Sequence, residues 1–483
     1  MAAAPPLRAG PLRVSADGRE PWPRAHFAIA GDNASRQETH PREDPLAGPR
    51  TAQLRWPVPG VTQMHAVSPA TPARSRSGGR LPRPVAIALL GLAGIAIAVV
   101  PVALLLARWD WLSSTRLIGR VYLLDLGDIT VYFRESAWVV GPGRLFVTIR
   151  SEYPLLANLA FGAVRLASQP LVPVFGALKA YEVTWIVLAY WVLLTSISYS
   201  LRVTGRRVAL LWLTPAVLYF SLLRFDLLPT MATLLALVEA RDGRPHRSAA
   251  WLGIAIAFKG YALYALPAFL VWVVMRYGWR RAFGAAVLAT APMAVSLGIV
   301  YQLGGLTAML MPFQIQATRP PNGQSTWDVI QIVTRLRVSE WLTAHAYVPT
   351  LLSLAGALAA AALRPRTFGQ LVRAATLGIA GFVTFSVFYS PQYVLWFVPM
   401  AALDDGIWMF ASVVLLGWVT TVYYPVLFGQ SKTAGWKLGA YQASVVVTTL
   451  VRTLVPAAAL PARWREARAA RPERPSALPD LSA

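Results

Sequence analysis

Long apolar runs, separated by short turns that are rich in Arg, make up most of the chain after residue 84. Several of these runs reach the roughly 20 residues that a helix needs to cross a bilayer core, and they do so without an ionised side chain. No pattern of alternating strands, no repeat of solenoid length and no soluble second domain accompanies them. The pattern predicts an all-α polytopic membrane protein, a bundle of about 10 to 12 transmembrane helices.

The Arg clusters between the apolar runs predict how the chain is oriented, because basic turns are retained in the cytoplasm. Counting from the first expected span, Val85 to Leu106, places both termini in the cytoplasm of a multi-pass plasma-membrane protein. The main outer segments are then residues 125–154, residues 304–346 and the turn from Tyr389 to Tyr393. The expected cytoplasmic turns carry Arg202, Arg206 and Arg207; Arg241, Arg244 and Arg247; Arg276, Arg280 and Arg281; and Arg364, Arg366 and Arg373.

The two ends of the chain differ in composition from the apolar part, residues 84–460. Residues 1–83 are rich in Pro, Ala, Gly and Arg, with twelve Arg and no Lys, and we expect a disordered cytoplasmic tail that touches anionic lipid. Residues 461–483 form a second basic cytoplasmic tail. An alternative start of translation at Met64 would remove most of the first tail.

Two of the apolar runs are expected to be broken within the membrane. The run 249–275 is too long for one upright span, and a single crossing would place one of its flanking Arg turns outside. We therefore expect two short helices that meet near Lys259-Gly260, and a similar break at Ser390-Pro391 in the run 382–403. Irregular backbone at membrane depth is tolerated only where it is buried in protein or lines a wet cavity, so both breaks are expected to line a site.

Composition changes this picture little but excludes several classes of protein. With 56% hydrophobic and 14% charged residues, the net charge of +23 is explained by the basic turns and tails, not by nucleic-acid binding. The chain has no Cys, its five His are scattered, and no Gly-rich loop precedes a helix with Lys and Ser or Thr. These features predict no metal site, no cofactor and no nucleotide-driven pump.

Four carboxylates stand out in the first outer segment: Asp125, Asp128, Glu135 and Glu152, interleaved with aromatic residues. A loop carboxylate that accepts a proton from an attacking hydroxyl can contribute roughly 10² to 10⁴ in rate as a general base. Asp128 is our first candidate for such a base, and Asp125, three residues earlier, is the alternative. A lone Asp in a loop is more often a helix cap or a solvated residue.

The motifs around Asp128 carry a resemblance to a known family. Asp128, Val131-Tyr132, Gly141 with Gly143, and Glu152-Tyr153-Pro154 occur in the same order and at similar spacing as in the first outer loop of glycosyltransferase family 87, of the GT-C class. The chain departs from the family's Glu-Tyr-Pro-Pro motif at its last position, which is Leu155 here. The resemblance covers about residues 85–456 and implies a GT-C-like bundle whose first outer loop carries the catalytic carboxylate, with Tyr132, Glu152 and Tyr153 at the substrate.

Further elements resemble the same family and imply further substrate-binding residues. Lys259 with Tyr261 and Pro267 suggests a lysine that holds the lipid phosphate, although a Lys at this depth can also snorkel to the interface. The Arg224-Phe225-Asp226 turn can contribute to the site or only cap a helix. Ser390-Pro391-Gln392-Tyr393 suggests a place for Gln392 and Tyr393 in the acceptor or phosphate pocket. More loosely, Arg319 would clamp phosphate and Trp327 stack on a sugar, or both would lie in an ordinary wet loop.

The resemblance implies an inverting, integral-membrane hexosyltransferase. It would move a sugar, commonly mannose, from a polyprenyl-phosphate donor to a glycolipid or cell-envelope glycan on the outer face. A transporter or lipid-sugar flippase is the alternative, because broken helices around buried charge also occur in carriers. A carrier would need its carboxylates at mid-membrane between two repeats, whereas these lie in an outer loop and the halves show no symmetry. A non-catalytic assembly partner would leave the acidic cluster unexplained.

Overall fold

The computed structural model describes residues 116–118, 121–122, 128–205, 208–317, 319, 325–422, 424 and 435–460. These residues belong to one compact unit, Ser75–Ala483. Both predicted tails, the expected first span and Asp125 lie outside the described residues, as do Arg206 and Arg207 of one predicted cytoplasmic turn.

The described chain is helical, apart from one short hairpin that the sequence pattern did not predict. The hairpin pairs β1 (Arg116–Ile118) with β2 (Val121–Tyr122) in antiparallel fashion. The elements up to the middle of the chain are α3 (Ile129–Glu135), η1 (Ser136–Val139), α4 (Leu155–Ala167), η2 (Gln169–Leu171), α5 (Val172–Phe175), α6 (Ala177–Thr204), α7 (Val208–Trp212), α8 (Pro215–Leu223), α9 (Leu227–Arg241), α10 (Pro245–Phe258) and η3 (Gly260–Ala265).

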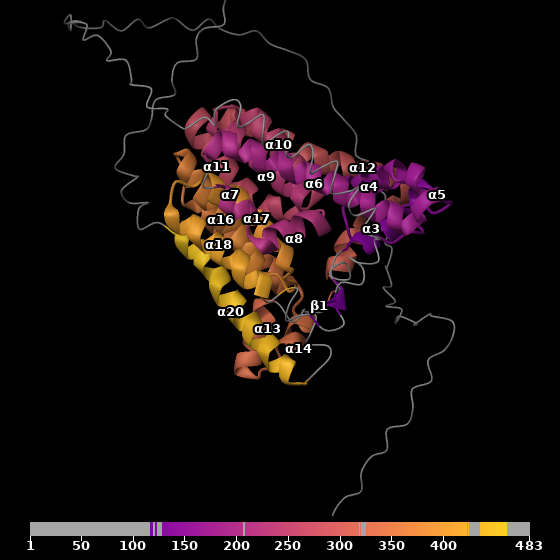
Figure 1. Ribbon diagram of the computed structural model, residues 1–483. Coiled ribbons are helices and arrows are strands. Elements are labelled where there is room, and N and C mark those ends of the chain that lie inside the picture. The colour runs from indigo at the N-terminus through magenta and orange to yellow at the C-terminus, as the bar shows by residue number, and fades with distance from the viewer. Residues whose placement is uncertain are drawn as a thin grey trace, which may run out of the picture. The chain divides into compact units, whose positions relative to one another are not determined.

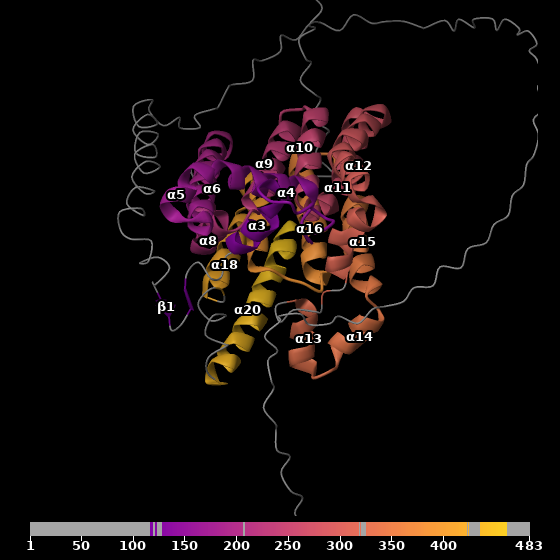
Figure 2. The same cartoon turned by 90° about the vertical axis from the view of Figure 1, so that its right-hand side faces the viewer.

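The second half contains one very long helix and several shorter ones. The elements are α11 (Leu266–Tyr277), α12 (Trp279–Ala317), α13 (Thr326–Thr334), α14 (Val338–Ala344), α15 (Tyr347–Ala362), α16 (Phe368–Phe385), η4 (Pro391–Tyr393), α17 (Val394–Leu403), α18 (Ile407–Thr421) and α20 (Gly435–Ala459). Helix α12 is kinked at Gly305, where φ is +69°, a backbone conformation that glycine adopts at little cost. Figures 1 and 2 both place α13 close to α20, and Arg452 Nη2 of α20 donates a hydrogen bond to Thr326 Oγ1 at the start of α13.

The predicted polytopic membrane character is confirmed by helix length and composition. In the described part of the chain, six helices are long and apolar enough to cross a membrane, or up to eight if two bent pairs each count as one span. This is fewer than the 10 to 12 predicted, partly because the expected first span is not described. A second reason is that apolar runs are divided into helices such as α17 and α18, which have 10 and 15 residues. A straight span needs about 20 residues.

Both predicted breaks are confirmed, and a third lies at the Arg224-Phe225-Asp226 turn. Helix α10 ends at Phe258, and Lys259 takes an extended conformation (φ −160°, ψ 124°) before η3. Helix α16 ends at Phe385, and Ser390 is likewise extended (φ −122°, ψ 135°) before η4. Helices α8 and α9 are bent by 111° at the third break. Each break frees backbone from helical geometry and turns polar side chains away from the helix axis.

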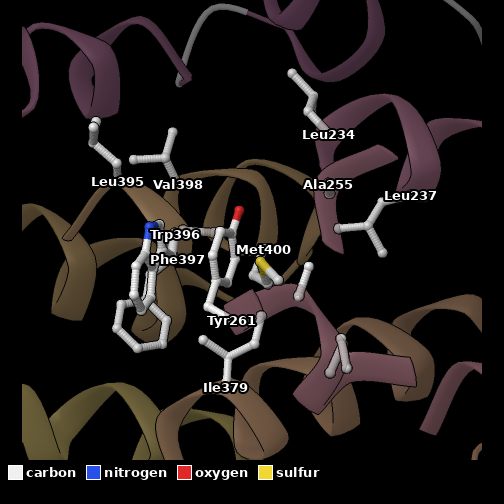
Figure 3. Packing of buried hydrophobic residues seen from close by; sticks show 14 of the residues in the cluster. Leu234, Leu237, Ala255, Tyr261, Ile379, Leu395, Trp396, Phe397, Val398 and Met400 are labelled. Atoms are coloured by element: carbon white, nitrogen blue, oxygen red, sulfur yellow. The ribbon is translucent and has the colours of Figure 1, made fainter. Parts of the chain in front are cut away.

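The three breaks pack around α17, the most buried helix of the described chain. Nine of its ten residues are buried, and Figure 3 shows Trp396, Phe397 and Met400 of this helix beside Tyr261 of η3. Gly378 of α16 lets that helix approach η3 closely, because a Cβ at this position would overlap the carbonyl oxygen of Tyr264. The close packing of α16, α17 and η3 is what brings the breaks at Lys259 and Ser390 together.

Candidate active site

Asp128 lies where the start of α3 meets the break between α8 and α9. Its backbone N–H donates to the carbonyl oxygen of Leu223 at 3.4 Å, and its carboxylate forms an ion pair with Arg224. The Tyr132 hydroxyl, one helical turn later, donates to Asp128 Oδ2 at 3.5 Å. The Asp128 side chain remains 23% exposed. The first predicted outer segment is therefore tied by a charge pair to the Arg224-Phe225-Asp226 turn, with Asp128 still accessible.

Asp226, two residues after Arg224, pairs with a different element. Its buried carboxylate accepts hydrogen bonds from Lys259 Nζ at 2.8 and 3.0 Å and from Trp396 Nε1 at 2.8 Å. The Lys259 ammonium also lies 4.8 Å from the ring centroid of Phe225. A lysine that snorkels to the interface would direct its ammonium into water, whereas Lys259 is held by a carboxylate and by aromatic rings. The structure therefore opposes the snorkelling alternative.

Glu152 connects the first outer segment to the segment 304–346. Its carboxylate forms an ion pair with Arg319 and accepts a hydrogen bond from Gln316 Nε2 at 3.2 Å. The Arg319 guanidinium also lies 4.5 Å from the ring centroid of Phe388, in the stretch between α16 and η4. Arg319 thus joins two of the predicted outer segments to the break that carries Gln392.

The Ser390-Pro391-Gln392-Tyr393 turn is buried against α17. The Ser390 hydroxyl donates to Gln392 Oε1, and the Tyr393 ring stacks on that of Trp396 with centroids 3.7 Å apart. Pro391 begins η4, as suits a residue with no N–H to donate and a fixed φ. The polar and aromatic groups of the turn are therefore held in fixed positions by packing.

These groups surround one cavity of about 1200 Å³. Its charged lining residues are two carboxylates, Asp128 and Glu152, and three cations, Arg224, Lys259 and Arg319. Much of the remaining lining is apolar and comes mainly from α12, with Met293, Leu297, Val300, Met309 and Phe313 of α12 and Leu342 of α14 among the residues. A chamber with a charged end and an apolar wall has the character expected for an amphiphilic ligand.

The structure therefore brings together most of the predicted site residues, which come from segments far apart in the sequence. Eight of them line the cavity: Asp128, Glu152, Tyr153, Arg224, Lys259, Arg319, Gln392 and Tyr393. Their ion pairs leave hydrogen-bonding capacity for a ligand. Lys259, for example, directs two hydrogen bonds at Asp226, and an ammonium has three N–H donors.

The expectation of direct substrate contact is corrected for Tyr132 and Asp226. Both side chains are 0% exposed, and neither lines the cavity. Tyr132 stacks on Phe161, with centroids 4.3 Å apart, and its hydroxyl accepts a hydrogen bond from the backbone N–H of Phe225 at 3.3 Å. Each of the two can influence a ligand only through a neighbour that reaches the cavity.

Trp327, for which the sequence left open sugar stacking or a place in an ordinary wet loop, is absent from the cavity lining. Its indole N–H instead donates to the carbonyl oxygen of Phe385 at 2.7 Å, which anchors α13 to the end of α16. The described structure thus gives Trp327 a packing role. Asp125, the alternative base, lies outside the described residues.

Sequence reasoning did not identify two groups next to the site. The first is Trp396, whose bond to Asp226 spans 170 positions. The second is a buried network in which Ser151 Oγ donates to Glu135 and Asn158 Nδ2 donates to Ser151 Oγ at 3.0 Å. The position of Glu135 in the acidic segment was the only signal for this network. Burial raises the pKa of Glu135 to about 7, although the Ser151 hydrogen bond acts in the opposite direction.

In the part of the chain that the structure describes, no group of three His, Asp or Glu side chains is placed to hold a metal ion.

Comparison with known proteins adds little to this geometry. No protein-family model matches the sequence, and no curated protein matches it. Among solved structures, the crystal structure of ArnT from Cupriavidus metallidurans in the apo state matches over 76% of this chain and 78% of that one, at 14% sequence identity and a TM-score of 0.32. A TM-score this low does not establish a common fold, so the match carries no argument here. The fold and site define a helical multi-pass membrane protein with a charged, amphiphilic cavity.

Proposed function

We propose that the protein is an integral membrane glycosyltransferase of the GT-C class that resembles family 87. It would transfer a sugar, most simply mannose, from a polyprenyl-phosphate donor to a glycolipid or cell-envelope glycan acceptor. The observation that carries the proposal is the convergence of Asp128, Lys259, Arg319 and Gln392, from four separate segments, on one cavity that also has an apolar wall. The family motifs around Asp128 and Ser390 lead independently to the same residues.

Asp128 would act as the general base. It would take the proton of the acceptor hydroxyl as the oxygen attacks the anomeric carbon of the donor sugar, and the bond from that carbon to the phosphate oxygen would break. Attack on the face opposite the phosphate would invert the anomeric configuration. The partial exposure of Asp128 at the cavity wall supports this role, and its pairing with Arg224 holds the carboxylate in one position.

Lys259 and Arg319 would bind the donor phosphate and stabilise the charge that develops on the leaving polyprenyl phosphate. Three cations reach the cavity lining and can bind an anionic ligand, although each is paired with one carboxylate: Arg224 with Asp128, Lys259 with Asp226 and Arg319 with Glu152. The apolar wall formed mainly by α12 would take the first part of the lipid chain. Because Asp128, Arg319 and Gln392 come from the predicted outer segments, the reaction would take place on the outer face, with both termini in the cytoplasm.

Reconstitution of the purified protein distinguishes sugar transfer to an acceptor from transport of the intact donor across the membrane. The protein would be incorporated into vesicles that contain polyprenyl-phosphate mannose, labelled in the sugar, together with an envelope glycolipid fraction. The proposal expects release of free polyprenyl phosphate and of a labelled, larger glycolipid by mass spectrometry, both dependent on the acceptor fraction. Movement of intact donor between leaflets, with no new glycosidic bond, would instead support the flippase alternative.

A further inference from the structure

The Asp226 carboxylate is used in an unusual way for a residue at a helix start. Asp at this position commonly accepts a hydrogen bond from a backbone N–H of the first turn, but Asp226 makes no side-chain cap bond to α9. Both oxygens instead bind Lys259 Nζ, and Oδ1 also accepts the indole N–H of Trp396. The carboxylate is fully buried, and a buried carboxylate is stable only when such partners satisfy it.

Trp396 is held rigidly, so its N–H has a fixed direction. Its ring lies between two others: Tyr261, nearly parallel at 4° with centroids 4.2 Å apart, and Tyr393 at 3.7 Å. Figure 3 shows Trp396 beside Tyr261 within the buried cluster. Only 1% of Trp396 is exposed. A stacked, buried indole donor fixes the carboxylate that it binds.

Lys259, by contrast, has little of its own to hold it in place. Lys259 is a single residue in extended conformation between α10 and η3. Its ammonium is carried by a flexible four-carbon side chain. The ammonium lies 5.4 Å from the ring centroid of Trp396 and 5.7 Å from that of Tyr393. The rings restrict where the cation can go, and Asp226 determines where within that space it stays.

We infer that Trp396 is a positioning residue: through Asp226 it holds the Lys259 ammonium at the cavity wall, where one N–H remains for an anionic oxygen of the ligand. Asp226 is then an internal counter-ion for Lys259. The identification of that oxygen as donor phosphate rests on the proposed function. The chain of contacts from Trp396 to Lys259 is independent of the proposed function.

The position of Lys259 can be measured without any activity assay. The chain contains four Lys, at 179, 259, 432 and 437, so competitive amine labelling followed by peptide mass spectrometry can follow Lys259 against Lys179 as internal reference. In the full-length protein in vesicles, Trp396→Phe keeps the stacked ring but removes the N–H. Loss of a hydrogen bond to a charged group should loosen the ion pair and raise the labelling rate of Lys259 about tenfold.

Trp212→Phe is the matched control. Its indole N–H donates to Ser200 Oγ at 3.1 Å, Trp212 is also buried, and it does not line the cavity. This variant should leave Lys259 labelling unchanged. Asp226→Asn gives a second arm, in which Lys259 labelling should also rise. Unchanged labelling of Lys259 in Trp396→Phe, or an equal rise in Trp212→Phe, would overturn the inference.

The effect on donor binding separates positioning from general packing. Trp396→Phe should raise the KM for polyprenyl-phosphate mannose about tenfold, and by less than about twofold when Lys259→Met and Asp226→Asn are already present. Trp396 also lines the cavity, so an equal effect in both backgrounds would mean that it acts through packing or direct ligand contact and not through Lys259, against the inference. If Lys259 labelling responds but removal of Lys259 leaves donor use unchanged, the phosphate role in the proposed function fails while the positioning of Lys259 stands.

Discussion

Arg224 and Asp226 are separated by a single residue, yet their side chains form ion pairs with two different elements. Arg224 pairs with Asp128 at the start of α3, and Asp226 pairs with Lys259 at the end of α10. The 111° bend between α8 and α9 makes this divergence possible. One short turn thereby places both the candidate base and the candidate phosphate ligand.

The pairing of Lys259 with Asp226 predicts how the protein responds to loss of the cation. Lys259→Met leaves Asp226 as a buried carboxylate without its counter-ion, and breaking a buried pair costs about 3–5 kcal/mol. We expect a lower melting temperature for this variant in detergent. Lys259→Met combined with Asp226→Asn should recover most of the loss, because no buried charge is left unpaired. A double variant no more stable than Lys259→Met alone would contradict the pairing.

Loss of the cation should also affect catalysis, on the proposed function. Lys259→Met with Asp226→Asn, once shown to be folded, should transfer sugar at about 10² lower kcat/KM, since a charge that stabilises the leaving phosphate is gone. Steady-state assays with polyprenyl-phosphate mannose measure this. Lys259→Arg should not restore the rate, because a planar guanidinium does not match a compact ammonium between three rings. Near-parental transfer by the charge-free variant would remove Lys259 from the phosphate site.

The raised pKa of Glu135 predicts that the stability of the folded protein depends on pH. Burial raises its pKa from 4.5 to about 7, so between these values the folded protein binds a proton that the unfolded chain has released. Stability therefore falls as pH rises from about 4.5 to 7, by roughly 3 kcal/mol. Glu135→Gln cannot ionise, and its amide oxygen can still accept from Ser151. Melting curves should show a smaller loss of stability from pH 5 to pH 8 in this variant than in the parent.

Glu340→Gln is the control for this series. Glu340 is largely exposed and pairs only across one turn with Arg337 in the described structure, so its replacement should leave the pH profile as in the parent. If the parent and Glu135→Gln lose stability equally between pH 5 and pH 8, Glu135 is not the cause of the pH dependence of stability.

The broken helices were predictable from the sequence because their signals are local. A Lys followed by Gly lies inside one apolar run, and a Ser-Pro pair lies inside another. Continuing a helix through either position costs free energy, so both mark helix ends. The structure has helix ends at Phe258 and Phe385, next to these signals. The short hairpin of β1 and β2 was missed, because two strands of three and two residues are too brief to give an alternating pattern.

The pairings within the site were not predictable in the same way. Arg224 could as well have satisfied Asp226, its neighbour in sequence, and nothing local indicates that Asp128 lies closer in space. The bond from Trp396 to Asp226 depends on how α17 packs against the start of α9, and that packing is decided by the shape of the whole core. Tyr132 was misread for a related reason: a Tyr in a motif can serve the site by packing behind it, and only burial distinguishes the two roles.

The pairing of Glu152 with Arg319 predicts coupling between two distant segments. Glu152→Gln and Arg319→Gln should each lower sugar transfer, because each removes a charge from the cavity lining. If the two side chains act as a pair, the double variant should lose less than the sum of the single effects, with a coupling of about 1 kcal/mol. Strict additivity in kcat/KM would show that the two residues act separately.

The predicted orientation can be tested directly, because the chain contains no native Cys. Single Cys residues at Arg244 and Arg337 probe a predicted cytoplasmic turn and a predicted outer segment. Their side chains are 45% and 82% exposed, so a reagent can reach them. A membrane-impermeant thiol reagent on intact cells should label position 337 and spare position 244. Labelling of position 244 from outside would reverse the predicted sidedness.

Transfer by Asp128→Asn is the measurement that bears most directly on the central claim. The change keeps the size of the side chain but removes the base, so transfer from polyprenyl-phosphate mannose should fall by roughly 10² or more, while donor binding survives. Asp125→Asn, a matched change in the same segment, should transfer at the parental rate. Parental transfer by both variants would contradict the catalytic assignment and favour a carrier; loss in Asp125→Asn alone would move the base to Asp125.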